Sequence, residues 1–264
     1  ENNMAVLGES GGAFPQLTIT QSQTWVPPMD GNVCVHIVGA GGGGLGSNSI
    51  AYAGGAGAYA KIPTLAVTTS GSFTLVVGVG GGGSTAAANA GDGGSSTISG
   101  TGLTGTKTCS GGLRGGSVVG GDGGTVSGSG ESWAGFSGGA GSGDGGGAVG
   151  IYATGQAGQG TPLRLGGMTD AQSGGLAMSG YGIICGGSQK SPSTSTSAGV
   201  FLYMGDAGDL CGGNNVSGNA SGFLRGGSGG IGGGGGGCKN SNNNTNAYGG
   251  SGGDGIILIQ YLPW

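Results

Sequence analysis

The alternation of apolar and polar residues predicts β-strands in the first hundred residues of the chain. The sequence QLTITQSQTWVPP alternates, and a turn at MDGN leads into VCVHIV. In VCVHIV, the first two valines and the isoleucine are expected on one face, with Cys34 and His36 on the other. The segment GSFTLVVGVG predicts a further strand, and Pro63 assigns the strand that contains it to a sheet edge or a bend.

The closing segment GIILIQY is apolar without alternation. This pattern is typical of a strand that is buried on both faces or paired in the centre of a sheet. We therefore expect the segment to close an antiparallel β-sandwich begun by residues 16–100, in a mainly β fold.

Glycine dominates the composition of the chain, with 77 of the 264 residues. Such a composition favours disorder, but only 7% of the residues are charged and the mean hydropathy is +0.07, which opposes disorder. Glycine density opposes helices, and the irregular spacing with 7 prolines excludes collagen. We expect packed polyglycine-II strands whose backbone groups bond sideways. The expected division is an irregular segment 1–15, a sandwich of residues 16–104 plus 254–264, and a long glycine-rich insertion of residues 105–253.

The charge and the cysteines narrow the class of protein. A net charge of −4 and a pI near 4.6 argue against a nucleic-acid partner. No apolar run approaches the roughly 20 residues of a membrane span. Five cysteines without a C-x-x-C motif are interpreted as buried thiols of a protein folded in a reducing cytoplasm; a disulfide framework is the alternative.

Residues that could carry chemistry are sparse. His36 is the only histidine and lies beside no candidate nucleophile in the sequence, so no triad is expected. The GDGG repeats at Asp92, Asp122 and Asp144 are interpreted as turns rather than calcium ligands. The run GGGGGGCKNS is not followed by the helix of a phosphate-binding loop. We expect no enzyme, no cofactor and no metal.

Short islands of larger residues interrupt the glycine-rich region and are the candidates for binding. Aromatic side chains fit poorly inside a glycine bundle, so they are expected on its flanks and end loops, where they bind a receptor or pack against a neighbouring subunit. The loops 188–199 and 239–248 are the favoured loop tips. The candidate receptor-binding residues are Trp133, Tyr181, Ser188, Lys190, Lys239, Asn243 and Tyr248.

Several blocks resemble the glycine-rich domains of bacteriophage tail-fibre proteins. These blocks are QTWVPP followed by VCVHIVGAGGGG, then GGAGAYAKIPTLAVTTSGSFTLVVGVGGGG, GDGGSSTIS and GGSGGDGIILIQY. The resemblance implies a virion protein of a tail fibre or tail tip, folded in the host cytoplasm, that acts as an adhesin for host attachment. Implied partners are a homotrimer, other tail proteins and a bacterial surface receptor, either a polysaccharide or an outer-membrane protein. A related arrangement in receptor tyrosine kinase ectodomains implies a jelly-roll-like sandwich.

Two alternatives stay open at this point. The chain could be a purely structural fibre or decoration protein of a virion without receptor contact. It could also be a eukaryotic secreted glycine-rich ectodomain, in which the sequons at Asn215, Asn219 and Asn243 would carry glycans.

Overall fold

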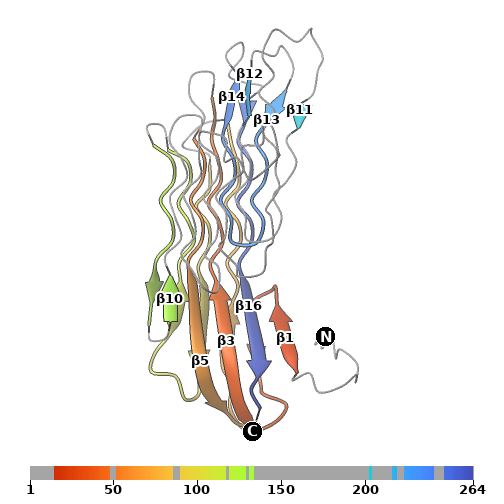
Figure 1. Cartoon of the computed structure of the whole chain (residues 1–264), viewed down its shortest axis with the longest axis vertical. Helices are drawn as coiled ribbons and strands as arrows, with labels where there is room; N and C mark the ends of the chain where they lie inside the picture. Colours follow the sequence, from red (N-terminus) through yellow and green to blue (C-terminus); the bar gives the residue numbers. More distant parts are fainter. Residues whose placement is uncertain are drawn as a thin grey trace, which may run out of the picture.

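The computed structural model describes residues 15–47, 52–85, 90–116, 119–128, 131–133, 202–203, 216–218, 223–240 and 247–263. Every regular element in these residues is a β-strand, which confirms the mainly β class. Figure 1 shows a base of two β-sheets, a long bundle of extended strands above it, and short strands at the far end. In the same residues, no helix has the length and apolar character needed to cross a membrane.

Two five-stranded sheets, counted over the described residues, form the base. The first contains, in spatial order, β1 (Gln16–Ile19), β16 (Ile256–Tyr261), β3 (Gly31–Val38), β5 (Tyr59–Val67) and β10 (Glu131–Trp133). The second contains β2 (Gln23–Trp25), β6 (Phe73–Val76), β7 (Ser96–Gly100), β8 (Lys107–Cys109) and β9 (Val126–Ser127). Neighbouring strands are antiparallel in both sheets.

Side chains of both sheets enter one hydrophobic core. Val33 and Val35 of β3 are fully buried in it, on the face that the alternation predicts. Phe73 and Leu75 enter the core from the second sheet, and the Phe73 ring lies 5.3 Å from that of Trp25. Burying each such side chain stabilises the fold by about 1.5–3 kcal/mol, so the base has the apolar content that the glycine segments lack.

The C-terminal strand lies in the middle of the first sheet, as its unbroken apolar run predicts. β16 pairs with β1 on one side and with β3 on the other. Ile257 and Ile259 point into the shared core. Ile256 packs on the opposite face with Val38, and Ile231 of the glycine bundle covers this pair in part. The inner face of β16 is therefore buried, and its outer face is buried at Ile256 but half-buried at Leu258 and exposed at Gln260.

Pro63 lies at an irregularity of the sheet. The pairing of β3 with β5 shifts register between Val33 and Val35, opposite Pro63 and Thr64. The expected bend is present, but β5 is not an edge strand, because β10 pairs with its first three residues, 59–61. The described partners of β5 end there, so the missing N–H of Pro63 interrupts no ladder on that side.

The strands of the base continue upward as glycine segments that form a bundle (Figure 1). Residues 39–46, which we call the central glycine strand, leave β3 and are surrounded by other segments. The N–H groups of Gly39, Gly42 and Leu45 all donate to residues 52–58, at 2.7–2.9 Å. The N–H groups between them donate to two other segments. Hydrogen bonds to the same neighbouring segment thus recur at every third residue. This repeat matches the three residues per turn of a polyproline-II backbone, as expected for packed polyglycine-II strands.

Six segments surround the central glycine strand. In its residues 39–45, the N–H groups donate to three segments in which the partner numbers fall as those of the strand rise, so these run antiparallel. Its carbonyls accept from three others whose numbers rise with its own, so these run parallel. The antiparallel segments are residues 52–58, 90–94 and 247–255, and the parallel segments are residues 78–84, 111–116 and 233–238. Backbone hydrogen bonds on all six sides replace side-chain packing as the source of cohesion.

Close packing of these segments explains why they consist of glycine. A Cβ atom added at Gly41, Gly42, Gly43 or Gly44 would lie closer than 3.0 Å to the backbone of a neighbouring segment. The four clashes involve three neighbouring segments, residues 78–84, 111–116 and 233–238, so no single shift relieves them.

The glycine bundle is distributed along the chain rather than inserted once. Residues 39–46 and 52–58 join β3 to β5, and residues 78–84 and 90–94 lie between β6 and β7. Conversely, β8, β9 and β10 belong to the sheets of the base. The expected boundaries at residues 104/105 and 253/254 therefore do not separate the base from the bundle. The reason is that each strand runs from the base into the bundle and back, exchanging apolar residues for glycine on the way.

Short parallel strands mark the far end of the bundle, which we call the distal end (Figure 1). One group contains β11 (Leu202–Tyr203), β13 (Leu224–Arg225) and β15 (Ala247–Tyr248). The other contains β12 (Val216–Gly218), β14 (Cys238–Asn240) and β4 (Gly46–Ser47).

Candidate functional site

A hollow of about 250 Å³ lies at the distal end of the bundle. We call it the distal hollow. It is lined by Gly83, Phe223, Arg225, Tyr248, Gly249 and Ser251. These residues come from three separate parts of the chain, which the glycine bundle brings together.

The register of two strands places the main side chains of the hollow. Arg225 of β13 is the direct partner of Tyr248 of β15, so their side chains lie next to each other. Phe223 precedes β13, and its ring centroid lies 5.8 Å from that of Tyr248, with 33° between the ring planes. Phe223 is 45% exposed and Tyr248 is 39% exposed. Two aromatic rings and a guanidinium thus share one solvent-accessible surface.

The floor of the hollow is backbone with one hydroxyl. The N–H of Gly83 donates to Ser251 Oγ at 3.5 Å, and the N–H of Gly249 donates to the carbonyl of Ser84 at 3.2 Å. Ser251 therefore keeps a hydroxyl hydrogen for another acceptor. None of the described residues that line the hollow carries a carboxylate.

The structure brings only part of the predicted receptor-binding set to the distal end. Tyr248 lines the distal hollow, and Lys239 lies in β14, also at the distal end. Trp133 is the last residue of β10 in the base, and so it does not lie at the distal end. The reason is that the segment ESW pairs with β5 instead of turning at the end of a glycine segment. Tyr181, Ser188, Lys190 and Asn243 lie outside the described residues.

Two residues of the hollow were missed by the sequence prediction. Phe223 and Arg225 lie in the sequence SGFLR, one of the short groups of larger residues in the glycine-rich region, and neither is among the candidates given above. The sequence signal that could have indicated them is an aromatic residue two positions from a basic residue, in a chain with 7 basic residues. Their neighbour Tyr248 lies more than twenty residues away, and no local pattern predicts that pairing.

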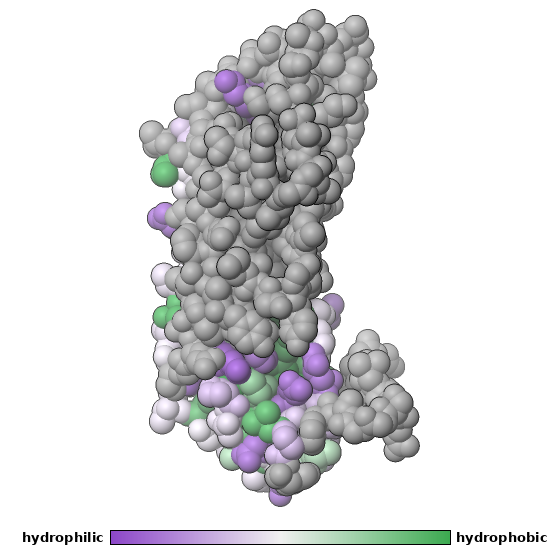
Figure 2. Space-filling model, in the orientation of Figure 1, coloured by the Kyte–Doolittle hydropathy of each residue, from purple (hydrophilic) through white to green (hydrophobic). Residues whose placement is uncertain are grey.

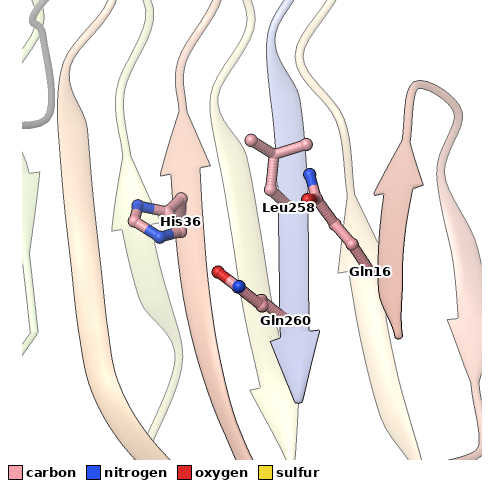
Figure 3. Close-up of a pocket in the computed structure, with 4 residues that line it drawn as sticks. All are labelled: Gln16, His36, Leu258 and Gln260. Carbon is pink, nitrogen blue, oxygen red and sulfur yellow. The ribbon is translucent and has the colours of Figure 1, made fainter. Parts of the chain in front are cut away.

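A second, smaller hollow lies on the outer face of the first sheet in the base. Its lining residues are Gln16, His36, Leu258 and Gln260. Figure 3 shows these four side chains on the neighbouring strands β1, β16 and β3. This hollow measures about 140 Å³, little more than half the volume of the distal one.

His36 has a thiol neighbour that the sequence analysis did not predict. Its Nε2 lies 3.4 Å from Sγ of Cys34, and its Nδ1 lies 2.7 Å from the hydroxyl of Tyr59. A cysteine–histidine pair can generate a nucleophilic thiolate. Here the orienting group is a hydroxyl rather than a carboxylate, and Cys34 is only 6% exposed. We therefore interpret the group as packing on the outer face of the sheet.

The aspartates of the GDG motifs have a different role from the expected turn. Asp254 Oδ1 accepts the N–H of Gly80 at 2.7 Å, and Asp92 Oδ1 accepts the N–H of Arg114 at 2.9 Å. Both lie in extended segments of the bundle, where a carboxylate supplies an acceptor for an N–H of the neighbouring segment. Within the described ranges, no three His, Cys, Asp or Glu residues gather as metal ligands would. Asp144 lies outside those ranges.

Three of the five cysteines are described, and all three are buried thiols: Cys34, Cys109 and Cys238. Burial raises the pKa of the Cys109 thiol and of the Cys238 thiol to about 12, against small opposing contributions from backbone hydrogen bonds. These two thiols are protonated and unreactive at neutral pH. Cys185 and Cys211 lie outside the described residues.

Comparison with known proteins agrees with this architecture. The sequence model of one protein family, described as a glycine-rich domain, matches residues 18–262. No curated protein matches the chain. The match includes both the strands of the base and the glycine segments between them. The chain therefore belongs to the glycine-rich domain family.

Proposed function

We propose that the chain is a virion protein of a phage tail fibre or tail tip and acts as a host-receptor-binding adhesin. In this proposal the glycine bundle is a rigid spacer, the base joins the fibre, and the distal end contacts the bacterial surface. The observation that carries the proposal is the position of the distal hollow, with its two exposed aromatic rings, at the end of the bundle remote from the base.

The arrangement of the base supports this orientation. β1 and β16 pair side by side in the first sheet, so the first and last strands lie at the same end of the molecule. A fibre that joined the module through this end would leave the distal end exposed. The surface of the base in Figure 2 mixes hydrophilic and hydrophobic side chains, as suits contact with other tail proteins.

The rigidity of the bundle supports a binding role at its tip. Each segment around the central glycine strand is fixed by backbone hydrogen bonds of 2.7–3.1 Å. A surface held by such a scaffold loses little conformational entropy when it binds, and this preorganisation raises affinity.

The proposal includes a homotrimer, which a glycine-rich chain with few large side chains favours because subunits can share apolar surface. Three apolar side chains on the flanks of the bundle are available for such contacts. They are Val79, which is 72% exposed, Val119, which is 57% exposed, and Leu113, which is 48% exposed. Sedimentation equilibrium should give three times the chain mass of 24.4 kDa. A monomer at all concentrations would contradict this part.

Adsorption tests the adhesin role. Labelled protein should bind at least one strain of a bacterial panel saturably and should block adsorption of the phage that carries it. A variant with Phe223→Ala and Tyr248→Ala should lose most of this binding, whereas Val26→Ala, which removes an exposed side chain in the base, should keep it. Immunogold electron microscopy should place the chain on tail fibres. Saturable binding to no strain, or labelling away from the tail, refutes the proposal and favours a purely structural or non-viral role.

A further inference from the structure

We propose that the distal hollow binds an acidic sugar ring, such as a uronic-acid or sialic-acid residue of a surface polysaccharide. The inference rests on the proposed adhesin function and names the ligand class of its contact surface. Three properties of the hollow carry it: the two aromatic rings, the guanidinium between strands β13 and β15, and the glycine floor.

The aromatic rings select for a sugar face. One side of a pyranose ring exposes C–H groups, which carry weak positive charge and pack on the negative face of an aromatic ring. The rings of Phe223 and Tyr248 are tilted by 33° with centroids 5.8 Å apart, so they are neither parallel nor perpendicular. Both remain more than one-third exposed. A ligand ring can therefore cover one face and touch the edge of the other.

Arg225 gives the site its charge preference. A guanidinium binds a carboxylate through two parallel hydrogen bonds, a geometry that a neutral hydroxyl does not match. The chain has 7 basic residues in all, and Arg225 is one of the described residues that line the hollow.

The floor favours a sugar over a peptide. An extended peptide binds such surfaces by adding a strand to open backbone N–H groups. The N–H groups of Gly83 and Gly249 already donate to Ser251 Oγ and to the carbonyl of Ser84. The Ser251 hydroxyl remains as a donor for a ligand oxygen. A volume of about 250 Å³ admits one or two sugar rings, below the range of about 300–1,000 Å³ for drug-sized ligands.

The test is a glycan array followed by calorimetry with the full chain. The array carries oligosaccharides of glucuronate, galacturonate and N-acetylneuraminate, each beside its methyl ester, which removes only the charge. At least one acid should bind saturably and better than its ester. Tyr248→Ala should weaken binding about ten-fold. Arg225→Gln should reduce binding of the acid to the level of its ester, and Val26→Ala, at an exposed residue of the base, should leave the binding of both ligands unchanged. Circular dichroism should show that all three variants keep the wild-type fold.

Three results would overturn the inference: no acid on the array binds, Tyr248→Ala leaves the affinity unchanged, or Arg225→Gln keeps the preference for acid over ester. If the chain adsorbs to bacteria, but protease treatment of the cells abolishes adsorption and acidic glycans do not affect it, the sugar site is refuted and the adhesin proposal stands. If the chain binds acidic glycans but is absent from virions, the adhesin proposal is refuted and the sugar site stands.

Discussion

Replacing Gly81 by alanine should destabilise the protein strongly, whereas the same change at the adjacent Gly82 should not. The Cβ of an alanine at position 81 would lie 2.7 Å from the carbonyl carbon of Gly91 and 2.7 Å from the amide nitrogen of Gly43, with the Gly91 oxygen closer still. To restore an ordinary contact of 3.4 Å, a backbone segment must move by at least about 0.7 Å. At position 82 nothing lies within 4 Å of the added atom.

The cost at position 81 follows from what that movement breaks. The Gly43 N–H donates to Gly91 at 2.9 Å, and the Gly81 N–H donates to Gly41 at 2.9 Å. Two weakened or unpaired buried backbone groups cost about 1–3 kcal/mol each, and the strain of overpacking adds about 1–3 kcal/mol. The expected loss for Gly81→Ala is on the order of 3–9 kcal/mol, while Gly82→Ala should gain about 0.5 kcal/mol through the unfolded chain.

Thermal denaturation followed by circular dichroism compares the two variants directly. A loss of 3 kcal/mol corresponds to a decrease in Tm of about 6–12 °C for a domain of this size. The Tm of the Gly82→Ala variant should stay at or slightly above the wild-type value. If both variants melt at the wild-type temperature, the segments are not packed backbone to backbone, and the explanation of the glycine content is refuted.

Three further outcomes are expected. Raising the pH above 9.0 should lower the free energy of unfolding, because the thiols of Cys109 and Cys238 ionise in the unfolded chain, whereas their folded pKa of about 12 keeps them protonated. The cost is about 1.4 kcal/mol per thiol at pH 10. Urea denaturation of C109A/C238A should show a weaker dependence of stability on pH, and the same pH dependence as the wild type would be the contrary result. Asp254→Ala should cost about 1 kcal/mol through the lost acceptor for Gly80, and Asp254→Asn should cost less in the same assay; equal losses would contradict this role. Phe73→Ala should cost about 3–5 kcal/mol, since this ring is 1% exposed in the shared core, and a chemical-denaturation loss below about 1 kcal/mol would count against that core.

Much of the base could be predicted because its signals are local. The alternation in VCVHIV places Val33 and Val35 in the core, and the unbroken apolar run of β16 indicates its central position. The extent of each sheet was harder to predict. β8, β9 and β10 are two or three residues long, and segments so short carry little periodicity among glycines.

The order of segments in the bundle could not be predicted, because glycine carries no side-chain pattern. The central glycine strand forms hydrogen bonds on six sides, and its sequence does not indicate which neighbour lies on which side. The distal hollow shares this difficulty. Arg225 and Tyr248 meet through the register of β13 with β15, which depends on that order. The aromatic islands predicted a binding surface in general terms, and Tyr248 was the one selected residue found in the hollow.

Native-state hydrogen exchange at the glycine amides is the most direct test of the central claim, that the bundle is a rigid hydrogen-bonded scaffold. The amides of Gly42, Gly43 and Gly44 donate to three different segments at 2.8–2.9 Å. They should exchange at least about a thousand times more slowly than in an unstructured peptide, close to the limit set by global unfolding. Exchange of these three amides at the rate of an unstructured glycine peptide would contradict the account.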